Sequence, residues 1–448
     1  MYIKMPENAK KIIDTLERAG YEAYIVGGCV RDAVLGKEPD DWDITTSATP
    51  MQVKGLFKRT IDTGLQHGTV TVMYGREGYE VTTYRIDGAY LDHRRPDEVT
   101  FTTSLAEDLR RRDFTINAMA YSPKSGIIDL YGGMSDIERH IIRAVGNATE
   151  RFDEDALRIL RAIRFSAQLD FDIEEATRDA CRAQARYLRD ISAERIRVEL
   201  EKLLLSDHPE RLIDAYEIGI TAVILPEFDT MMETPQHNPN HKYDVGRHTI
   251  EVIRHIEAEP VARLGALLHD CGKPAAKTTD EDGTDHFRNH NIIGMEIAGQ
   301  VLTRLKYDND TRKKVVKLVK WHDYGMGSLP SKAKFRKALS EMGADFFPYI
   351  LKIRKADVAG QSEYRRLEKL SNLQSLGEMY DEIIHDEDCL RIKDLALSGR
   401  DLIAMGIKPG EHMGEILDYL LACVLENPSL NDEDTLINIV RDKFAELF

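Results

Sequence analysis

Two aspartates, Asp41 and Asp43, follow the glycine pair Gly27–Gly28 and Arg31. In an extended strand alternate residues face the same side, so both carboxylates would point together and Trp42 would face away. Paired carboxylates repel unless a cation binds them, and two Mg2+ ions held in this way serve in-line phosphoryl transfer. A triphosphate could approach the backbone of the glycines closely, and Arg31 could offset its charge. These residues predict a Mg2+-dependent nucleotidyl transfer site; the alternative is a strand-to-helix turn beside a solvated strand end.

A third carboxylate and a polar motif follow in the chain. Glu80 opens a run of β-branched residues that predicts a neighbouring strand and a further metal ligand, unless it is an edge-strand glutamate. The polar stretch from Arg85 to Val99 is expected to form a surface loop. Beyond it, Arg112, Asp113 and Asn117 offer donors and acceptors suited to the two hydroxyls of a ribose.

A pair of charged residues further on could read a base. On a helix, Asp155 and Arg158 are three positions apart and share a face. Cytosine and adenine both show an amine donor beside an acceptor nitrogen, so an acceptor-only Asp and a donor-only Arg can pair with either base. Uracil and guanine would leave both charges unpaired. Arg161 is assigned to the same nucleotide site, and a helix-surface salt bridge is the alternative for the pair.

Five ordered motifs between about residues 24 and 200 carry a resemblance to a known family. They are GGCVRD with DWD, RRDFTINA, DLYGG, EDALR and ERIRVE. In this order they resemble the class II tRNA nucleotidyltransferases, that is, the CCA-adding enzymes and their bacterial poly(A) polymerase relatives. The resemblance implies an α+β chain with a polymerase-beta-like head bearing the metal aspartates and a helical neck that selects the base. It also implies a body and tail that bind tRNA, and template-independent addition of CCA from CTP and ATP.

Narrower activities stay open within this resemblance, namely A-only addition, CC-only addition and polyadenylation. The enzymes that add only CC resemble this family with a shortened loop, so the intact stretch from Arg85 to Val99 disfavours that activity. Polyadenylating relatives tend to carry a long basic extension, whereas the tail of this chain is short and acidic around Asp386–Asp388 and Asn431–Asp434.

Histidines and aspartates in the second half form another candidate site. His248, the pair His269–Asp270 and Asp357 occur in an order that resembles the HD phosphohydrolase superfamily. The resemblance implies a divalent metal such as Mn2+ or Ni2+ and phosphodiesterase or phosphatase action on 2',3'-cyclic or terminal phosphates, although many such modules are structural. A further hypothesis, from another class, is an HD phosphohydrolase whose head only binds RNA.

Other histidines surround this region of the sequence. His290 and His322 could supply a second metal or bind phosphate. His237, His241 and His286 are expected to be ordinary surface residues.

Prolines and changes in periodicity predict five regions in the 448 residues. They are a nucleotidyltransferase head (1–139), a helical neck (140–205), a helical bridge (206–240), an HD domain (241–365) and a helical, tRNA-binding tail (366–448). A net charge of -16 disfavours indiscriminate nucleic-acid binding, so RNA contacts are expected from local basic stretches such as Arg312–Lys320.

Composition also bounds location and partners. Five scattered cysteines suggest a reducing cytoplasm, and neither a signal peptide nor an apolar run long enough for a membrane is apparent. The expected partners are therefore tRNA, CTP and ATP, with neither a membrane nor DNA, in a cytoplasmic protein.

Overall fold

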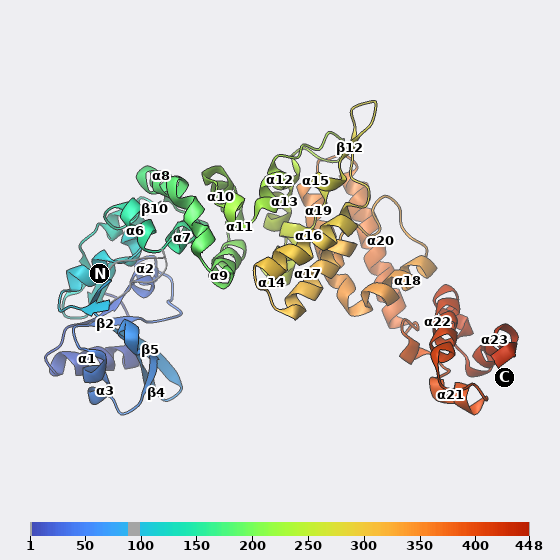
Figure 1. Cartoon of the computed structure of the whole chain (residues 1–448), viewed down its shortest axis with the longest axis horizontal. Coiled ribbons are helices and arrows are strands. Elements are labelled where there is room, and N and C mark those ends of the chain that lie inside the picture. The colour runs from blue at the N-terminus through green and yellow to red at the C-terminus, as the bar shows by residue number, and fades with distance from the viewer. Residues whose placement is uncertain (1, 88–98, 448) are drawn as a thin grey trace. The chain divides into compact units, whose positions relative to one another are not determined.

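The computed structural model describes residues 2–87 and 99–447 and divides the chain into two compact units (Figure 1). One comprises Met1–Asp229 with Arg304–Lys306, and the other comprises Thr230–Thr303 with Tyr307–Phe448. The first unit contains a large mixed sheet and the second is almost entirely helical, as the α+β class predicts. The five-region division is finer than these two units and stays a prediction.

A seven-stranded sheet lies at the centre of the first unit in the order β3-β4-β5-β2-β1-β8-β9. Neighbouring strands are antiparallel except β2 and β5, which run parallel. The strands are β1 (Ala23–Val26), β2 (Ile44–Thr46), β3 (Thr60–Gly64), β4 (Thr69–Tyr74), β5 (Glu77–Thr83), β8 (Met119–Ser122) and β9 (Gly126–Asp129).

A separate hairpin pairs β6 (Arg85–Asp87) with β7 (Val99–Phe101). The predicted surface loop from Arg85 to Val99 therefore starts and ends in this hairpin, and its residues 88–98 lie outside the described part of the chain.

Amphipathic helices cover the sheet. In α1 (Glu7–Arg18) the apolar residues Ile12, Ile13 and Leu16 recur at helical spacing and are all buried. The other helices of this region are α2 (Gly28–Val34), α3 (Pro50–Leu56), α4 (Leu105–Arg110) and α5 (Gly133–Glu138).

Helices make up the rest of the first unit. Buried residues occupy ten positions of α7, including Arg158 and Arg164, because this helix packs against α9. The helices are α6 (Ala148–Glu154), α7 (Leu157–Leu169), α8 (Glu175–Gln184), α9 (Ala193–Leu204), α10 (Leu212–Ile218), α11 (Thr221–Ile224) and, across the boundary, α12 (Pro226–Met232). Two short strands, β10 (Ile141–Ile142) and β11 (Asp172–Ile173), pair in parallel beside them.

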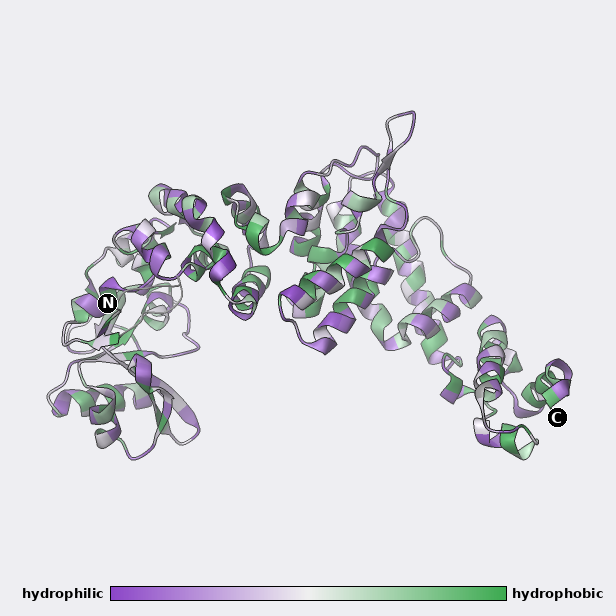
Figure 2. Cartoon of the chain, viewed as in Figure 1, coloured by the Kyte–Doolittle hydropathy of each residue, from purple (hydrophilic) through white to green (hydrophobic). Residues whose placement is uncertain are grey.

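The second unit is built on packed helices, with α13 against α14 and α19, and α14 against α17. Hydrophobic and hydrophilic residues alternate around these helices (Figure 2), which is typical of helices with one buried face. They are α13 (Val245–His255), α14 (Pro260–Leu268), α15 (Lys273–Ala276), α16 (His290–Arg304), α17 (Asn309–Trp321), α18 (Lys332–Met342), α19 (Phe347–Gly360) and α20 (Arg366–His385). A small hairpin joins β12 (Thr278–Thr279) to β13 (Asp285–His286).

The C-terminal helices share a core of their own. Leu402, Ile416, Leu420 and Val440 are among its buried residues. The helices are α21 (Gly399–Ala404), α22 (Glu411–Glu426) and α23 (Glu433–Lys443). Within residues 2–87 and 99–447, every helix falls short of the length and apolar character that a membrane span requires.

Candidate active site

The carboxylates predicted to bind metal gather at the start of β2. The expectation that Asp41 and Asp43 both lie within a strand is wrong, because β2 begins at Ile44. The carbonyl of Asp43 accepts a hydrogen bond from the Val26 N–H at 3.0 Å, but neither aspartate belongs to a strand. Ile44 pairs with Val81 on the parallel strand β5, so the preceding residues Asp43 and Glu80 are neighbours on one face of the sheet. Glu80 does lie on a neighbouring strand, as predicted.

Charge is concentrated at this position. Solvent reaches Asp43, yet protein atoms surround much of its side chain, and this burial raises the pKa of its carboxyl. Arg112 opposes the shift, whereas the carboxylates of Glu80 and Asp41 add to it. Close carboxylate oxygens are the ligands that Mg2+ prefers, and a divalent cation would relieve their repulsion. Asp43 and Glu80 therefore offer the type of donor that the predicted Mg2+ ions need, whereas Asp41, Asp43 and Glu80 are not among the described groups of three whose ligand atoms lie within 4.8 Å of one another.

Guanidinium groups line the same pocket. Asp43 and Glu80 share a cavity of about 150 Å³ with Arg85, Arg111 and Arg112. Sequence reasoning assigned Arg112 to the ribose and did not assign Arg85 or Arg111 to the site, although Arg111 precedes Arg112 in the same motif. A pocket lined by both carboxylates and guanidinium groups can hold metal ions and a triphosphate together.

The glycines make room for this arrangement. Gly27 has a φ of 84°, which favours glycine, and a Cβ there would lie 2.9 Å from Nη1 of Arg112. Its N–H donates to the Met119 carbonyl at 3.1 Å, so that amide does not face a phosphate as predicted. Gly28 is the first residue of α2, and a Cβ added to it would lie 3.7 Å from Nη2 of Arg31.

Arg31, Asn117, Asp113 and Arg161 form one hydrogen-bonded chain. Arg31 Nη1 donates to Asn117 Oδ1 at 2.7 Å, and Asn117 Nδ2 donates to Asp113 Oδ1 at 3.2 Å. Arg161 Nε donates to Asp113 Oδ2 at 2.8 Å. Burial alone would raise the pKa of Asp113, but the Arg161 guanidinium holds it below its usual range. The structure thus brings Asp113 and Asn117 together with Arg31 and Arg161, while Arg112 faces the carboxylates.

Asp155 and Arg158 do not share one helix. The expectation of a common face is wrong, because α6 ends at Glu154 and α7 starts at Leu157, with Asp155 extended at φ −144° and ψ 103°. Asp155 Oδ2 accepts from Arg195 Nη2 at 2.7 Å. Arg158 Nη1 donates to Glu154 Oε2 at 2.6 Å instead. The alternative of a salt bridge between the predicted pair is therefore also wrong.

A buried cluster in the second unit contains the predicted HD residues. His248 Nε2 lies 3.1 Å from Asp357 Oδ1, and His269 Nε2 lies 3.1 Å from Asp270 Oδ2. Together with His290 and His322 they form two groups of three side chains. Within each group, one ligand atom from every residue lies within 4.8 Å of the others. One group is His248, His269 and Asp357, and the other is Asp270, His290 and His322.

Three of the histidines present lone pairs to the centre of the cluster. The Nδ1 atoms of His269, His290 and His322 lie 2.7–2.8 Å from the carbonyls of Ala266, Phe287 and Val319, respectively. A carbonyl only accepts, so each Nδ1 carries the proton and each Nε2 is free to bind a metal. The Nε2 atoms of His290 and His322 face each other at 3.1 Å, an unfavourable approach of two lone pairs that a metal between them would relieve.

Asp270 belongs to the second group and also contacts the first, because its Oδ2 lies 3.1 Å from His269 Nε2. Its Oδ1 is 3.5 Å from His290 Nε2 and 3.6 Å from His322 Nε2, and its Oδ2 is 2.7 Å from Lys273 Nζ. The donor set of imidazole nitrogens and carboxylates suits Mn2+ or Ni2+. The cluster therefore fits the predicted metal, and it brings the four predicted ligands together with His290 and His322, the two histidines predicted to supply a second metal or bind phosphate.

The three histidines expected at the surface differ in their surroundings. His237 and His286 are exposed and pair with Asp285 and Asp280, respectively. His241 is half-buried, with its ring centroid 4.9 Å from that of His248, so its assignment to the surface is wrong. Burial lowers its pKa to about 2, because an imidazolium would be poorly solvated there.

The mixed sheet and the pocket at the start of β2 define a nucleotidyltransferase head. Comparisons with known proteins agree with this class. Residues 23–143 match the family model of the poly A polymerase head domain. Residues 170–232 match the model of an RNA and SrmB-binding site of polymerase A, and residues 292–440 match domain 2 of tRNA nucleotidyltransferases.

Relatives extend over nearly the whole chain. The CCA-adding enzyme of Lactiplantibacillus plantarum is 36% identical over 437 residues, which cover 97% of this chain and 95% of the relative. The crystal structure of the Bacillus stearothermophilus CCA-adding enzyme in complex with CTP is 28% identical, with a TM-score of 0.74 and 99% of each chain covered. A Thermotoga maritima CCA-adding enzyme complexed with tRNA shares the fold at 21% identity and a TM-score of 0.58, over 99% of this chain and 100% of that one. The chain therefore belongs to the CCA-adding enzyme family and is a tRNA nucleotidyltransferase, which implies divalent metal use in the head.

Proposed function

We propose that this protein adds CCA to the 3' ends of tRNA from CTP and ATP, with Mg2+ in the head. The observation that carries the proposal is the register of β2 and β5, which makes Asp43 and Glu80 neighbours in a pocket that three arginines also line. Relatives that span nearly the whole chain and are named as CCA-adding enzymes support the same activity. Because its substrate is tRNA, we also propose a cytoplasmic location.

The pocket suggests how the reaction proceeds. Asp41, Asp43 and Glu80 would hold the Mg2+ ions, which when bound polarise the attacking and leaving oxygens of an in-line displacement. The 3' hydroxyl oxygen of the tRNA forms a bond to the α-phosphorus, the bond to the bridging oxygen breaks, and pyrophosphate leaves. Arg85, Arg111 and Arg112 lie where they can neutralise the triphosphate and the departing pyrophosphate.

Base selection is proposed for Asp155 and Arg158. Arg195 fixes the carboxylate of Asp155, and Arg158 is held by Glu154 and by the Arg111 carbonyl at 2.9 Å. Both side chains are therefore anchored by different partners, and a cytosine or adenine edge could join them by accepting from Arg158 and donating to Asp155. The Arg31–Asn117–Asp113–Arg161 chain would support the nucleotide from the head and from α7.

A product-length assay tests the activity. Purified protein receives transcripts that end before CC, before A and after CCA, with CTP, ATP or both. Full CCA addition extends the first by three nucleotides and the second by one, and leaves the third unchanged. Extension of only the transcript that ends before A indicates A-only addition. Extension of the transcript that ends before CC by two nucleotides and no more indicates CC-only addition, and a long added tail indicates polyadenylation.

A variant pair assigns the reaction to the metal aspartates. Asp43→Asn should lower CTP incorporation at saturating Mg2+ by at least about 100-fold, because an amide is a poor metal ligand. Asp62→Asn is the matched control, since Asp62 lies on β3 of the same sheet and pairs with Lys54. Incorporation by Asp43→Asn within a few fold of the control would reject the assignment.

We also propose that the second unit is a metal-dependent phosphohydrolase that acts on phosphate esters at RNA ends. The convergence of Nε2 lone pairs and carboxylates in a buried cluster favours this candidate. His248, His269 and Asp357 would hold one metal, and Asp270, His290 and His322 a second one. A bound metal of this kind supplies a hydroxide nucleophile at neutral pH.

Metal analysis tests the cluster. Protein purified without chelators should contain Mn2+ or Ni2+ at up to two equivalents, and Asp270→Ala should lower that content by at least one equivalent. Asp280→Ala, which removes an exposed aspartate that pairs only with His286 among the ion pairs of the described residues, should leave it unchanged. Metal well below one equivalent in the wild-type protein would reject the site.

A further inference from the structure

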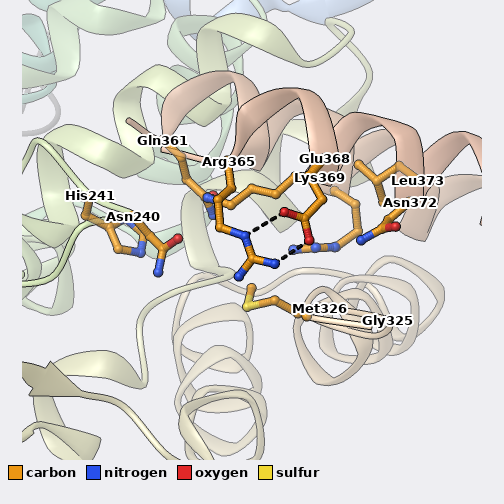
Figure 3. Close-up of a pocket in the computed structure, with 12 residues that line it drawn as sticks. Asn240, His241, Gly325, Met326, Gln361, Arg365, Glu368, Lys369, Asn372 and Leu373 are labelled. Atoms are coloured by element: carbon orange, nitrogen blue, oxygen red, sulfur yellow. Dashed lines mark hydrogen bonds and ion pairs between the residues drawn. The ribbon is translucent and has the colours of Figure 1, made fainter. Parts of the chain in front are cut away.

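A cavity of about 190 Å³ adjoins the metal cluster of the second unit. Its walls come from α19, α20 and the loops around His241 and Met326 (Figure 3). Arg354 Nη1 donates to Asp357 Oδ2 at 2.9 Å, and Gln361 Nε2 donates to Asp357 Oδ1 at 2.9 Å. Since these two wall residues touch one proposed metal ligand and His241 packs on another, His248, a molecule in the cavity would lie next to the metals.

Positive charge predominates in the cavity. Arg354, Arg365 and Lys369 line it, and Glu368 is the one acidic residue among its lining residues. Glu368 pairs with Arg365, because its Oε2 accepts from Arg365 Nε at 2.6 Å, as the dashed lines in Figure 3 mark, and Arg354 and Lys369 are the other two cations of the lining. A net positive pocket in a chain of net charge -16 selects for an anionic ligand.

Two buried nitrogen atoms of the lining residues have no hydrogen-bond partner among the described residues. Arg354 is only 4% exposed, and its Nε is buried without a hydrogen-bond partner among the described residues. The same holds for Nδ1 of His241. Burial lowers the pKa of Lys369 and the guanidinium groups of Arg354 and Arg365 lower it further, whereas the Asp357 carboxylate opposes the shift. An anion in the cavity would relieve this repulsion and supply acceptors.

The remaining walls indicate what the anion is attached to. Met326 and Leu373 offer apolar surface, and Asn240 and Asn372 offer amides at the two ends of the cavity (Figure 3). Apolar walls with a few polar groups are typical of sites for small organic ligands. Cations, amides and apolar surface together match a phosphate joined to a sugar and a base.

We propose that this cavity binds a second phosphate of the nucleotide whose phosphate ester is cleaved at the metal cluster. The proposal rests on the proposed phosphohydrolase function and names its substrate class: nucleotide ends that carry two phosphates, one attacked and one recognised. In the reaction water attacks the phosphorus, the ester P–O bond breaks, the ribose oxygen leaves as a hydroxyl and inorganic phosphate is released.

Uridine 3',5'-bisphosphate and uridine 3'-monophosphate are matched probes for this class, because the base site of the head is expected to reject uracil. With the full-length, Mn2+-loaded protein, we expect phosphate release from the bisphosphate with a KM about tenfold lower and a similar kcat. Lys369→Ala and Arg365→Ala should bring the ratio of the two KM values close to one. Lys355→Ala is the control, because Lys355 is an exposed lysine of α19 that does not line the cavity, and it should keep the wild-type ratio.

Calorimetric binding of the same two probes separates the cavity from the chemistry. Tighter binding of the bisphosphate that Lys369→Ala abolishes would support the cavity even if neither probe is hydrolysed, and only the phosphohydrolase proposal would fail. Equal KM values or equal affinities for the two probes in the wild-type protein would overturn the cavity proposal, whether or not hydrolysis occurs.

Discussion

Asp155 is held in place by a residue far along the chain. Arg195 donates to its Oδ2, and the Leu157 N–H donates to its Oδ1 at 3.1 Å, so the carboxylate is fixed although it lies between two helices. A fixed acceptor discriminates between bases better than a mobile one, because a wrong base cannot induce it to turn away.

Replacing this carboxylate by an amide tests base selection at the residue scale. Asp155→Asn keeps the shape of the side chain but can turn a donor toward the base, so selection against UTP should fall by about tenfold to 100-fold. The measurement is the ratio of kcat/KM for CTP to that for UTP. Glu150→Gln, the same chemical change at an exposed position of α6, is the control. An equal loss of activity with both nucleotides would make Asp155 a structural residue.

Individual residues could be predicted from their own chemistry where that chemistry is local in the sequence, whereas distant residues such as His248 and Asp357 came from the resemblance to a family. Asp41 and Asp43 are two positions apart, and His269 and Asp270 are adjacent, so each pair was visible. Glu80 was uncertain because its role depends on strand register across 37 residues, which distant packing decides. His290 and His322 come from α16 and the end of α17, and only the helix packing brings both to Asp270.

At the scale of elements, types were predicted better than ends. A strand that contains Glu80 is predicted and found, but β2 starts after Asp43, and the helix expected around Asp155 is broken there. The end of an element at Asp43 or Asp155 depends on contacts with residues distant in the sequence, such as Val26 and Arg195, which the hydrophobic pattern does not record. Both of these ends lie in the first unit, one at the carboxylates beside β2 and one at the residues proposed to select the base.

The packing of α16 depends on one glycine. A Cβ on Gly272 would lie 2.0 Å from the His290 carbonyl and 2.5 Å from the Gly294 nitrogen. Gly272→Ala should therefore push the start of α16 away and remove His290 from the metal cluster. We expect metal content to fall by about one equivalent and the melting temperature to drop, as measured by elemental analysis and calorimetry.

Gly299→Ala is the control on the same helix. A Cβ at Gly299 would meet Val316 at an ordinary 3.8 Å, so this variant should keep both metals and gain slightly in helix stability. Full metal content in Gly272→Ala would show that α16 does not need this close approach.

For the whole molecule, the two candidate sites lie in different compact units. The carboxylates at β2 belong to the first unit, and the histidine cluster belongs to the second. Each is held by contacts within its own unit, so we expect their chemistry to be separable.

Crossed variants measure this independence. Asp270→Ala should leave the rate of CTP addition within about twofold of wild type, because no hydrogen bond of Asp270 reaches the head among the described contacts. Asp43→Asn should in turn keep the metal content of the second unit. Loss of CTP addition in Asp270→Ala, with the fold intact by circular dichroism, would show that the sites are coupled.

The chain contains two tryptophans, and each stands directly beside a candidate metal ligand. Trp42 lies between Asp41 and Asp43, and Trp321 precedes His322 and packs on Tyr324 with ring centroids 5.7 Å apart. Indole emission responds to nearby ions and to changes in solvation. Each unit therefore carries its own built-in fluorophore, and replacing one tryptophan by phenylalanine would leave a single optical signal for ion occupancy at the other site.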